Sequence, residues 1–182
     1  MAATIDLRKF RQSLINFLDE SVGLFAKDKP QELISTAILY VDPYGRASGR
    51  LCLDTLANSE KQVAESQHKG PHWYGEDEFG RYNDSPEDFG FFEFTCFEFA
   101  DFPDLYHVGN PIYFIDHEGR TLDANRERNS DDGINRSMFP SLCAYVCEFV
   151  GWNPLRRSDI FRVGVVMHDS KRVAFWRYVE GH

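Results

Sequence analysis

Apolar residues near the N-terminus recur at steps of three and four, the pattern of a helix that buries one face. The series comprises Leu7, Phe10, Leu14, Phe17, Leu18, Val22 and Phe25, and polar residues fill the opposite face. It predicts an amphipathic helix over about residues 6–27, followed by Pro30, which ends the pattern.

Runs rich in β-branched and apolar residues alternate with turn signals in the next part of the chain. Residues 33–41 and 46–54 flank an Asp-Pro-Tyr-Gly turn, which predicts an antiparallel hairpin. A short strand is expected at 112–116. Residues 160–167 and 172–179 flank a His-Asp-Ser-Lys turn and predict a closing hairpin.

Three further segments carry helix signals. The Ser-x-x-Gln spacing that begins at Ser59 has the form of a capping box and predicts a short polar helix over 59–68. The Ser-Pro-Glu-Asp sequence at 85–88 is typical of a helix start. Apolar residues within 138–149 predict a third amphipathic helix, and the polar stretch 123–136 is expected to be an exposed loop.

These elements predict an α+β fold, with a mainly antiparallel sheet and helices packed on one face. A chain of 182 residues is long enough for one well-buried core, so we expect a single domain over 1–182. No apolar run reaches the length of a membrane span, and the N-terminal residues lack the pattern of a secretory signal. The expected location is the cytoplasm.

The charge of the chain is concentrated in one window, residues 76–104. This window holds ten of the 29 carboxylates, one of the 20 basic residues and eight of the 16 phenylalanines. Its net charge of −9 equals that of the whole chain, since the remaining 19 acidic residues balance 19 basic ones. The acidity disfavours nucleic acid and anionic membrane as partners and favours a basic protein.

Two interpretations of the window remain open. In one, the phenylalanines are core residues and the carboxylates form a solvated rim. In the other, the carboxylates also steer and neutralise a basic protein partner. The second predicts aromatic anchors flanked by acidic residues, the usual arrangement of an interface. The anchors are Trp73, Tyr74 and Tyr82, and the flanking acids are Glu76, Asp77, Glu78, Asp84, Glu87 and Asp88.

Signals for chemistry are weaker. His68 and His72 are four residues apart and close to the first acids of the window, but Gly70-Pro71 separates them and breaks the helix that would align them. Because histidines and carboxylates are ligands of divalent metals, the alternative function is a small metal-dependent hydrolase that uses the clustered carboxylates with these histidines or His107. No nucleophile elbow or Gly-rich phosphate loop is present, and no cofactor or resident metal is expected. The four cysteines show no CxxC pair and are interpreted as reduced core thiols.

The run Arg81-Tyr82-Asn83-Asp84-Ser85-Pro86-Glu87-Asp88-Phe89 resembles a motif of the bacterial domain of unknown function family 4303. That motif has an arginine, an aromatic residue, then Ser-Pro-acid and another aromatic residue. The order of a first amphipathic helix, a strand pair, a helix start at Asn58-Ser59-Glu60 and a late hairpin is also similar. Tyr82 and Phe89 stand where tryptophans are typical of the family.

Members of that family, like those of immunity-protein superfamilies, occur beside genes of bacterial polymorphic toxins. The resemblance therefore implies a cytoplasmic antidote that binds the catalytic domain of a toxin. It transfers no catalytic residue to this chain. Because many toxin domains that attack RNA or DNA are basic, the acidic window agrees with a nuclease, either an RNase or a DNase, as the target.

Overall fold

A computed structural model describes residues 3–42, 48–69, 83, 85–98, 112–116, 118–123, 143, 147, 150–168 and 173–180. Within these ranges the helices are α1 (Leu7–Asp28), α2 (Leu56–Lys69) and a short 3-10 helix, η2 (Pro86–Asp88). The strands are β1 (Ala3–Asp6), β2 (Ile34–Asp42), β3 (Ser48–Thr55), β4 (Phe91–Glu98), β5 (Ile112–Ile115), β6 (Thr121–Asp123), β7 (Arg157–Met167) and β8 (Val173–Glu180).

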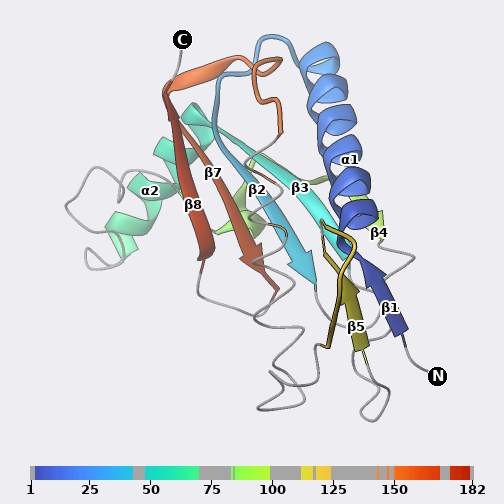
Figure 1. Cartoon of the computed structure of the whole chain (residues 1–182). Helices are drawn as coiled ribbons and strands as arrows, with labels where there is room; N and C mark the ends of the chain where they lie inside the picture. Colours follow the sequence, from blue (N-terminus) through green and yellow to red (C-terminus); the bar gives the residue numbers. More distant parts are fainter. Residues whose placement is uncertain are drawn as a thin grey trace.

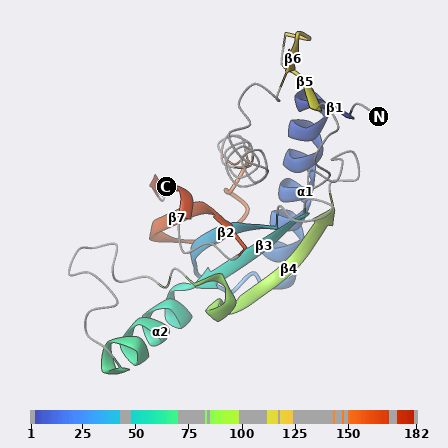
Figure 2. The same ribbon diagram turned by 90° about the horizontal axis from the view of Figure 1, so that it is seen from below.

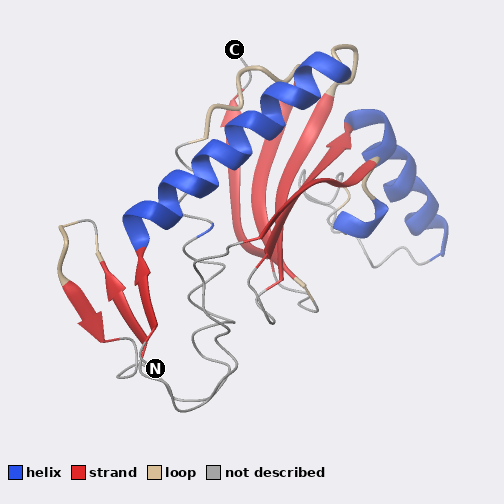
Figure 3. Ribbon diagram, turned by 90° about the vertical axis from the view of Figure 1, so that its right-hand side faces the viewer, coloured by secondary structure: helices blue, strands red, loops and turns tan. Residues whose placement is uncertain are grey.

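The strands form two sheets (Figures 1 and 3). The larger sheet has the order β4-β3-β2-β7-β8, and the smaller one has the order β1-β5-β6. In the larger sheet β2 and β7 run parallel, while the other three neighbouring pairs are antiparallel. The predicted α+β class with mainly antiparallel pairing is confirmed, and both predicted hairpins are present as β2-β3 and β7-β8. The expected packing of the helices on one face is wrong, because α1 and α2 lie on opposite sides of the larger sheet (Figure 2).

Helix α1 follows the predicted range closely. Asp6 caps its N-terminus by accepting a hydrogen bond from the Arg8 backbone N–H at 3.0 Å. The Lys29 N–H donates to the Phe25 carbonyl at 2.8 Å, which closes the last turn. No helix among the described residues is long and apolar enough to cross a membrane.

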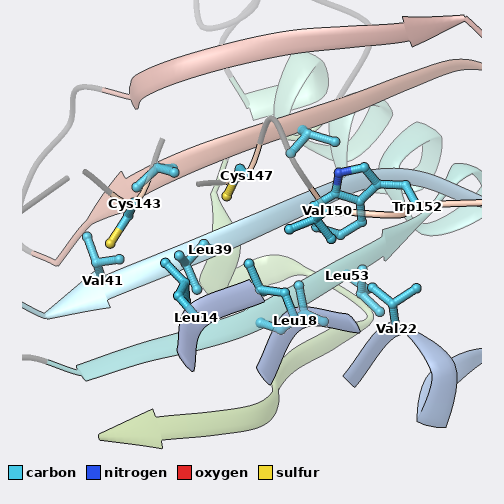
Figure 4. Packing of buried hydrophobic residues seen from close by; sticks show 14 of the residues in the cluster. Leu14, Leu18, Val22, Leu39, Val41, Leu53, Cys143, Cys147, Val150 and Trp152 are labelled. Atoms are coloured by element: carbon cyan, nitrogen blue, oxygen red, sulfur yellow. The ribbon is translucent and has the colours of Figure 1, made fainter. Parts of the chain in front are cut away.

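The main core lies between α1 and one face of the larger sheet (Figure 4). Leu14 and Leu18 point from the helix towards Leu39 and Leu53 of the strands, and all four are fully buried. Burying one such side chain contributes about 1.5–3 kcal/mol. Cys143, Cys147, Val150 and Trp152 complete this layer. We call the face of the larger sheet that α1 covers the first face.

Strand β4 also packs against α1. The Phe25 ring meets the rings of Phe91 and Phe94 edge to face, with centroids 4.8 Å and 5.1 Å apart. The Thr95 hydroxyl donates to the Ser21 hydroxyl at 2.7 Å. These contacts confirm the expectation that phenylalanines of the acidic window enter the core, and they place that part of the window in an edge strand.

Helix α2 begins at Leu56, three residues before the predicted start, so the expected capping box at Ser59 is wrong. Thr55, the last residue of β3, provides the cap instead, because its hydroxyl accepts from the Asn58 N–H at 3.0 Å. The hydroxyl of Ser59 lies within the helix and accepts from the Asn83 N–H at 2.7 Å. The Ser-x-x-Gln spacing therefore reflects a tertiary contact and not a helix start.

The helix-start signal at Ser85 produces only the single turn of η2. The Ser85 side chain makes no capping hydrogen bond to the backbone, and the extended strand β4 begins at Phe91. Of the predicted third helix, Cys143 and Cys147 are described and helical, while the other residues lie outside the described ranges. The expected loop 123–136 also lies outside them, apart from Asp123 in β6.

Candidate functional site

The second face of the larger sheet, opposite α1, carries a buried polar row. Asp54, Thr36 and Arg162 are register partners across β3, β2 and β7, and each is at most 2% exposed. The Arg162 Nη2 donates to the Thr36 hydroxyl and to the Asn83 carbonyl, both at 3.0 Å. An arginine is rarely buried so deeply unless its N–H groups find acceptors. The row therefore fixes the backbone at Asn83 onto the sheet.

Asp54 ties two further segments to the same row. Its Oδ1 accepts from the Asn58 side-chain amide at 2.7 Å and from the Gly90 N–H at 3.1 Å. The same Asn58 amide donates to the Asp88 carbonyl at 2.9 Å. Burial raises the pKa of Asp54, and the hydrogen bond from Asn58 is the largest of the effects that oppose this shift. The first turn of α2 and the end of η2 are thus held by one carboxylate.

The hydroxyl of Tyr40 joins three elements next to this row. It lies 2.9 Å from Glu87 Oε1 on η2 and 2.8 Å from His168 Nδ1 at the end of β7. A phenol carries one proton, so the consistent arrangement has Tyr40 donating to the Glu87 carboxylate and accepting from an Nδ1–H of His168. The Ser85 hydroxyl donates to Glu87 Oε2 at 3.2 Å. Both carboxylate oxygens of Glu87 therefore accept hydrogen bonds from side chains of the protein, although Glu87 is exposed.

An exposed aromatic ring lies beside this chain of hydrogen bonds. Phe92 of β4 is 38% exposed, and its ring centroid is 6.0 Å from that of Tyr40, which is only 4% exposed. Four carboxylates of η2 and β4 are exposed as well, and together with Phe92 we call them the acidic strip. Its acids are Glu87, Asp88, Glu93 and Glu98. The stretch 85–98 contains no Lys or Arg that would neutralise them.

One acid of the acidic strip is paired across the sheet. The Arg50 Nη1 of β3 lies 2.9 Å from Glu93 Oε1. Glu93 has a positive φ of 50°, a left-handed conformation that is uncommon outside glycine, and the register of β3 with β4 shifts between Leu51 and Leu53. This irregularity lets two consecutive side chains, Phe92 and Glu93, both be exposed.

The expected partner-binding residues are divided by the described ranges. Glu87 and Asp88 are exposed on η2, as an interface requires. The remaining seven lie outside the described residues: Trp73, Tyr74, Glu76, Asp77, Glu78, Tyr82 and Asp84. Tyr40, Phe92 and His168 were not predicted as members of a site. Alternation along 33–41 places Tyr40 on the face of the sheet opposite Leu39, and this pattern was the signal in the sequence that could have indicated its position.

Within the described ranges, no group of three or more His, Cys, Asp and Glu side chains is arranged to hold a metal ion. The side chain of His68 and all of His72 and His107 lie outside those ranges. The metal-dependent alternative gains no supporting geometry from the residues that are described.

The cysteines are free, but one of them corrects the expectation of four core thiols. Cys52, Cys143 and Cys147 are buried, whereas Cys96 is exposed on β4 because its neighbour Phe97 takes the side of the strand that faces Phe17 of α1 and Cys96 takes the opposite side. Burial raises the pKa of Cys52 to about 12 and that of Cys147 to about 12. These two thiols stay protonated near neutral pH and are poor nucleophiles.

Comparisons of the chain with protein-family models, with curated proteins and with solved structures gave no match.

Proposed function

We propose that this protein is an immunity-type binding protein that acts in the cytoplasm and neutralises a bacterial toxin. On this proposal, it covers the active site of a basic catalytic domain, a nuclease, with the acidic strip and the residues 73–84 that precede it. The observation that carries the proposal is an exposed phenylalanine on an edge strand among exposed carboxylates. The resemblance to family 4303 supplies the toxin as the class of partner.

The composition of the acidic strip supports a protein partner. Aromatic rings that bury on binding contribute much of the affinity of interfaces, and surrounding charges contribute to association rate and specificity. Phe92 is exposed enough to be covered by a partner, yet its ring already packs on Tyr40, so little side-chain freedom is lost on binding. Asp88 and Glu98 make no ion pair within the described ranges, so their charges remain directed to solvent.

The support beneath the acidic strip favours the same function. The Asp54 carboxylate holds Gly90 and Asn58, and Asn58 holds the Asp88 carbonyl, so the backbone on both sides of Phe89 is fixed before any partner arrives. Interfaces of inhibitors are commonly preorganised in this way, because ordering a loop on binding reduces the affinity.

The proposal is tested by capture, first with the product of the neighbouring gene and then with host lysate, at about 0.05 M and about 0.5 M salt. We expect one basic protein to be captured at low salt and less of it at high salt. The captured protein, once purified, should show nuclease activity that an equimolar amount of this chain abolishes.

A matched pair of variants makes the test specific to the acidic strip. The double change Asp88→Lys with Glu98→Lys alters the strip, while Glu20→Lys with Asp28→Lys makes the same change in net charge at exposed positions of α1. We expect the first pair to weaken binding at low salt about tenfold, equal to about 1.4 kcal/mol, and the second to leave it nearly unchanged. Equal effects of the two pairs would show that the acidic strip is not the interface.

A further inference from the structure

We infer that Tyr40 is the positioning residue of the acidic strip: its hydroxyl sets Glu87 and η2, and its ring sets Phe92, although Tyr40 itself is too buried to touch a partner. This inference rests on the proposed function for its role in binding. Its structural part stands on the contacts of Tyr40 alone. Tyr40 lies on β2, at the centre of the larger sheet, and reaches η2, β4 and the end of β7.

The hydroxyl of Tyr40 is the contact that decides where Glu87 lies. Glu87 is exposed, so without a hydrogen-bond donor from the protein its carboxylate would be free to turn into solvent. The bond from Tyr40 at 2.9 Å has an ionised acceptor, which makes it stronger than a bond between neutral groups. With Ser85 on the other oxygen, Glu87 is fixed against the sheet, and the neighbouring Asp88 is the η2 carboxylate directed to solvent.

The geometry also indicates which ring nitrogen of His168 carries a proton. Only an Nδ1–H on His168 satisfies Tyr40 and Glu87 together, because a phenol that donated to Nδ1 would leave its oxygen facing the Glu87 carboxylate. The His168 backbone N–H donates to the Val41 carbonyl at 2.8 Å, so the ring starts from a fixed point on the sheet. His168, Tyr40 and Glu87 thus form a chain of directed hydrogen bonds from β7 to η2.

The first test needs no partner. Tyr40→Phe keeps the ring beside Phe92 and removes only the hydroxyl, so we expect faster hydrogen exchange, by about fivefold, at the N–H groups of Asp88 and Phe89, which close the turn of η2. Exchange in α1 should change little. In ¹⁵N spectra His168 should be protonated at Nδ1 in the wild type and lose that preference in the variant. Unchanged exchange in η2 and an unchanged His168 signal would overturn the inference.

A double-mutant cycle separates positioning from general stabilisation. Glu87→Ala should reproduce the effect of Tyr40→Phe on η2, and the two changes together should have no greater effect than either one. Glu87→Gln keeps an acceptor for the Tyr40 hydroxyl and should largely retain the protection of η2. Additive effects of the two single changes would show that the Tyr40 hydroxyl acts on something other than Glu87.

The second test uses the basic protein captured by the wild type. We expect Tyr40→Phe to weaken its binding about threefold to tenfold while the melting temperature falls by only a few degrees. Wild-type affinity in a variant with a loosened η2 would overturn the role in binding and leave the proposed function intact. Absence of any basic partner for the wild type would contradict the proposed function, and the exchange experiment would still decide the position of η2.

Discussion

The two faces of the larger sheet use the same strands for different kinds of contact. On the first face, α1 and the strands meet mainly through leucine, valine and phenylalanine side chains. On the second face, a buried arginine, a buried aspartate and a tyrosine hold α2, η2 and Asn83 by directed hydrogen bonds. Figure 2 shows α1 and α2 on opposite sides of the sheet. Apolar packing supplies stability, whereas directed bonds select one position for each attached segment.

A cavity in the first face should have the largest effect on stability. Leu18 is fully buried between α1 and the sheet, so Leu18→Ala is expected to lower the free energy of unfolding by about 2–5 kcal/mol. Denaturant unfolding followed by circular dichroism measures this. The exposed Leu24 on the same helix is the control, because Leu24→Ala should cost less than about 1 kcal/mol. Similar losses at both positions would mean that α1 does not bury the predicted side.

Removing the arginine of the second face should have the next largest effect. Arg162→Met keeps much of the apolar stem but leaves the Thr36 hydroxyl and the Asn83 carbonyl without their donor. We expect a loss of about 2–4 kcal/mol in unfolding free energy. Hydrogen exchange should rise first at Asn83 and Ser85. A variant as stable as the wild type would show that the polar row selects a conformation without adding stability.

The pH dependence at Asp54 should be smaller and should have a defined sign. Because burial raises its pKa in the folded protein, the folded state binds this proton more tightly than the unfolded chain. The contribution of Asp54 to stability therefore falls as pH rises from its unfolded pKa, about 3.9, through its folded pKa. The variant Asp54→Asn should lack this pH-dependent contribution to stability. Unfolding free energy of the wild type minus that of the variant, measured from pH 3 to 7, should decrease.

Asp116 provides the opposite case for that measurement. Hydrogen bonds from the Arg120 backbone and side chain, and from the Glu118 N–H, lower its pKa. The contribution of Asp116 to stability is therefore present above its pKa in the unfolded chain and is lost as pH falls through its pKa in the folded protein. The same difference for Asp116→Asn should increase with pH. If both differences followed the same direction, the burial of Asp54 would not control its titration.

The smallest effect on stability is expected at Phe92, which is half-exposed on the second face. Phe92→Ala should lower the free energy of unfolding by less than about 1 kcal/mol, while binding of the captured partner weakens by about 1–2 kcal/mol. Calorimetry of unfolding and of binding gives the two values. Phe91→Ala is the matched change on the neighbouring residue, which packs on Phe25, and it should reverse the order of the two effects.

The elements that a local pattern specifies were predictable from the sequence. The spacing from Leu7 to Phe25 identified α1, and alternation with turn residues identified the two hairpins. The start of α2 was not predictable, because Thr55 at the end of a strand and Ser59 inside the helix both have a hydroxyl that can cap a helix. Which hydroxyl caps depends on the tertiary partner of Ser59, namely Asn83.

The site was predictable in its chemistry more than in its members. Charge alone located Glu87 and Asp88, which are exposed on η2. Tyr40 and His168 are 128 residues apart and meet only because β2 and β7 are neighbours in the sheet. A sequence pattern carries no record of such pairing, and the parallel neighbour of β2 comes from the far end of the chain.

The position of β7 has a consequence for how the chain folds during synthesis. β7 lies between β2 and β8, so β2 remains an edge strand until synthesis has passed β7 (Arg157–Met167). The β2-β3 hairpin is local and forms early, but its free edge is then open to pairing with other chains. Closing the long connection between β2 and β7 is slow compared with a hairpin. We therefore expect the nascent chain to pass through an aggregation-prone stage that ends when β7 inserts.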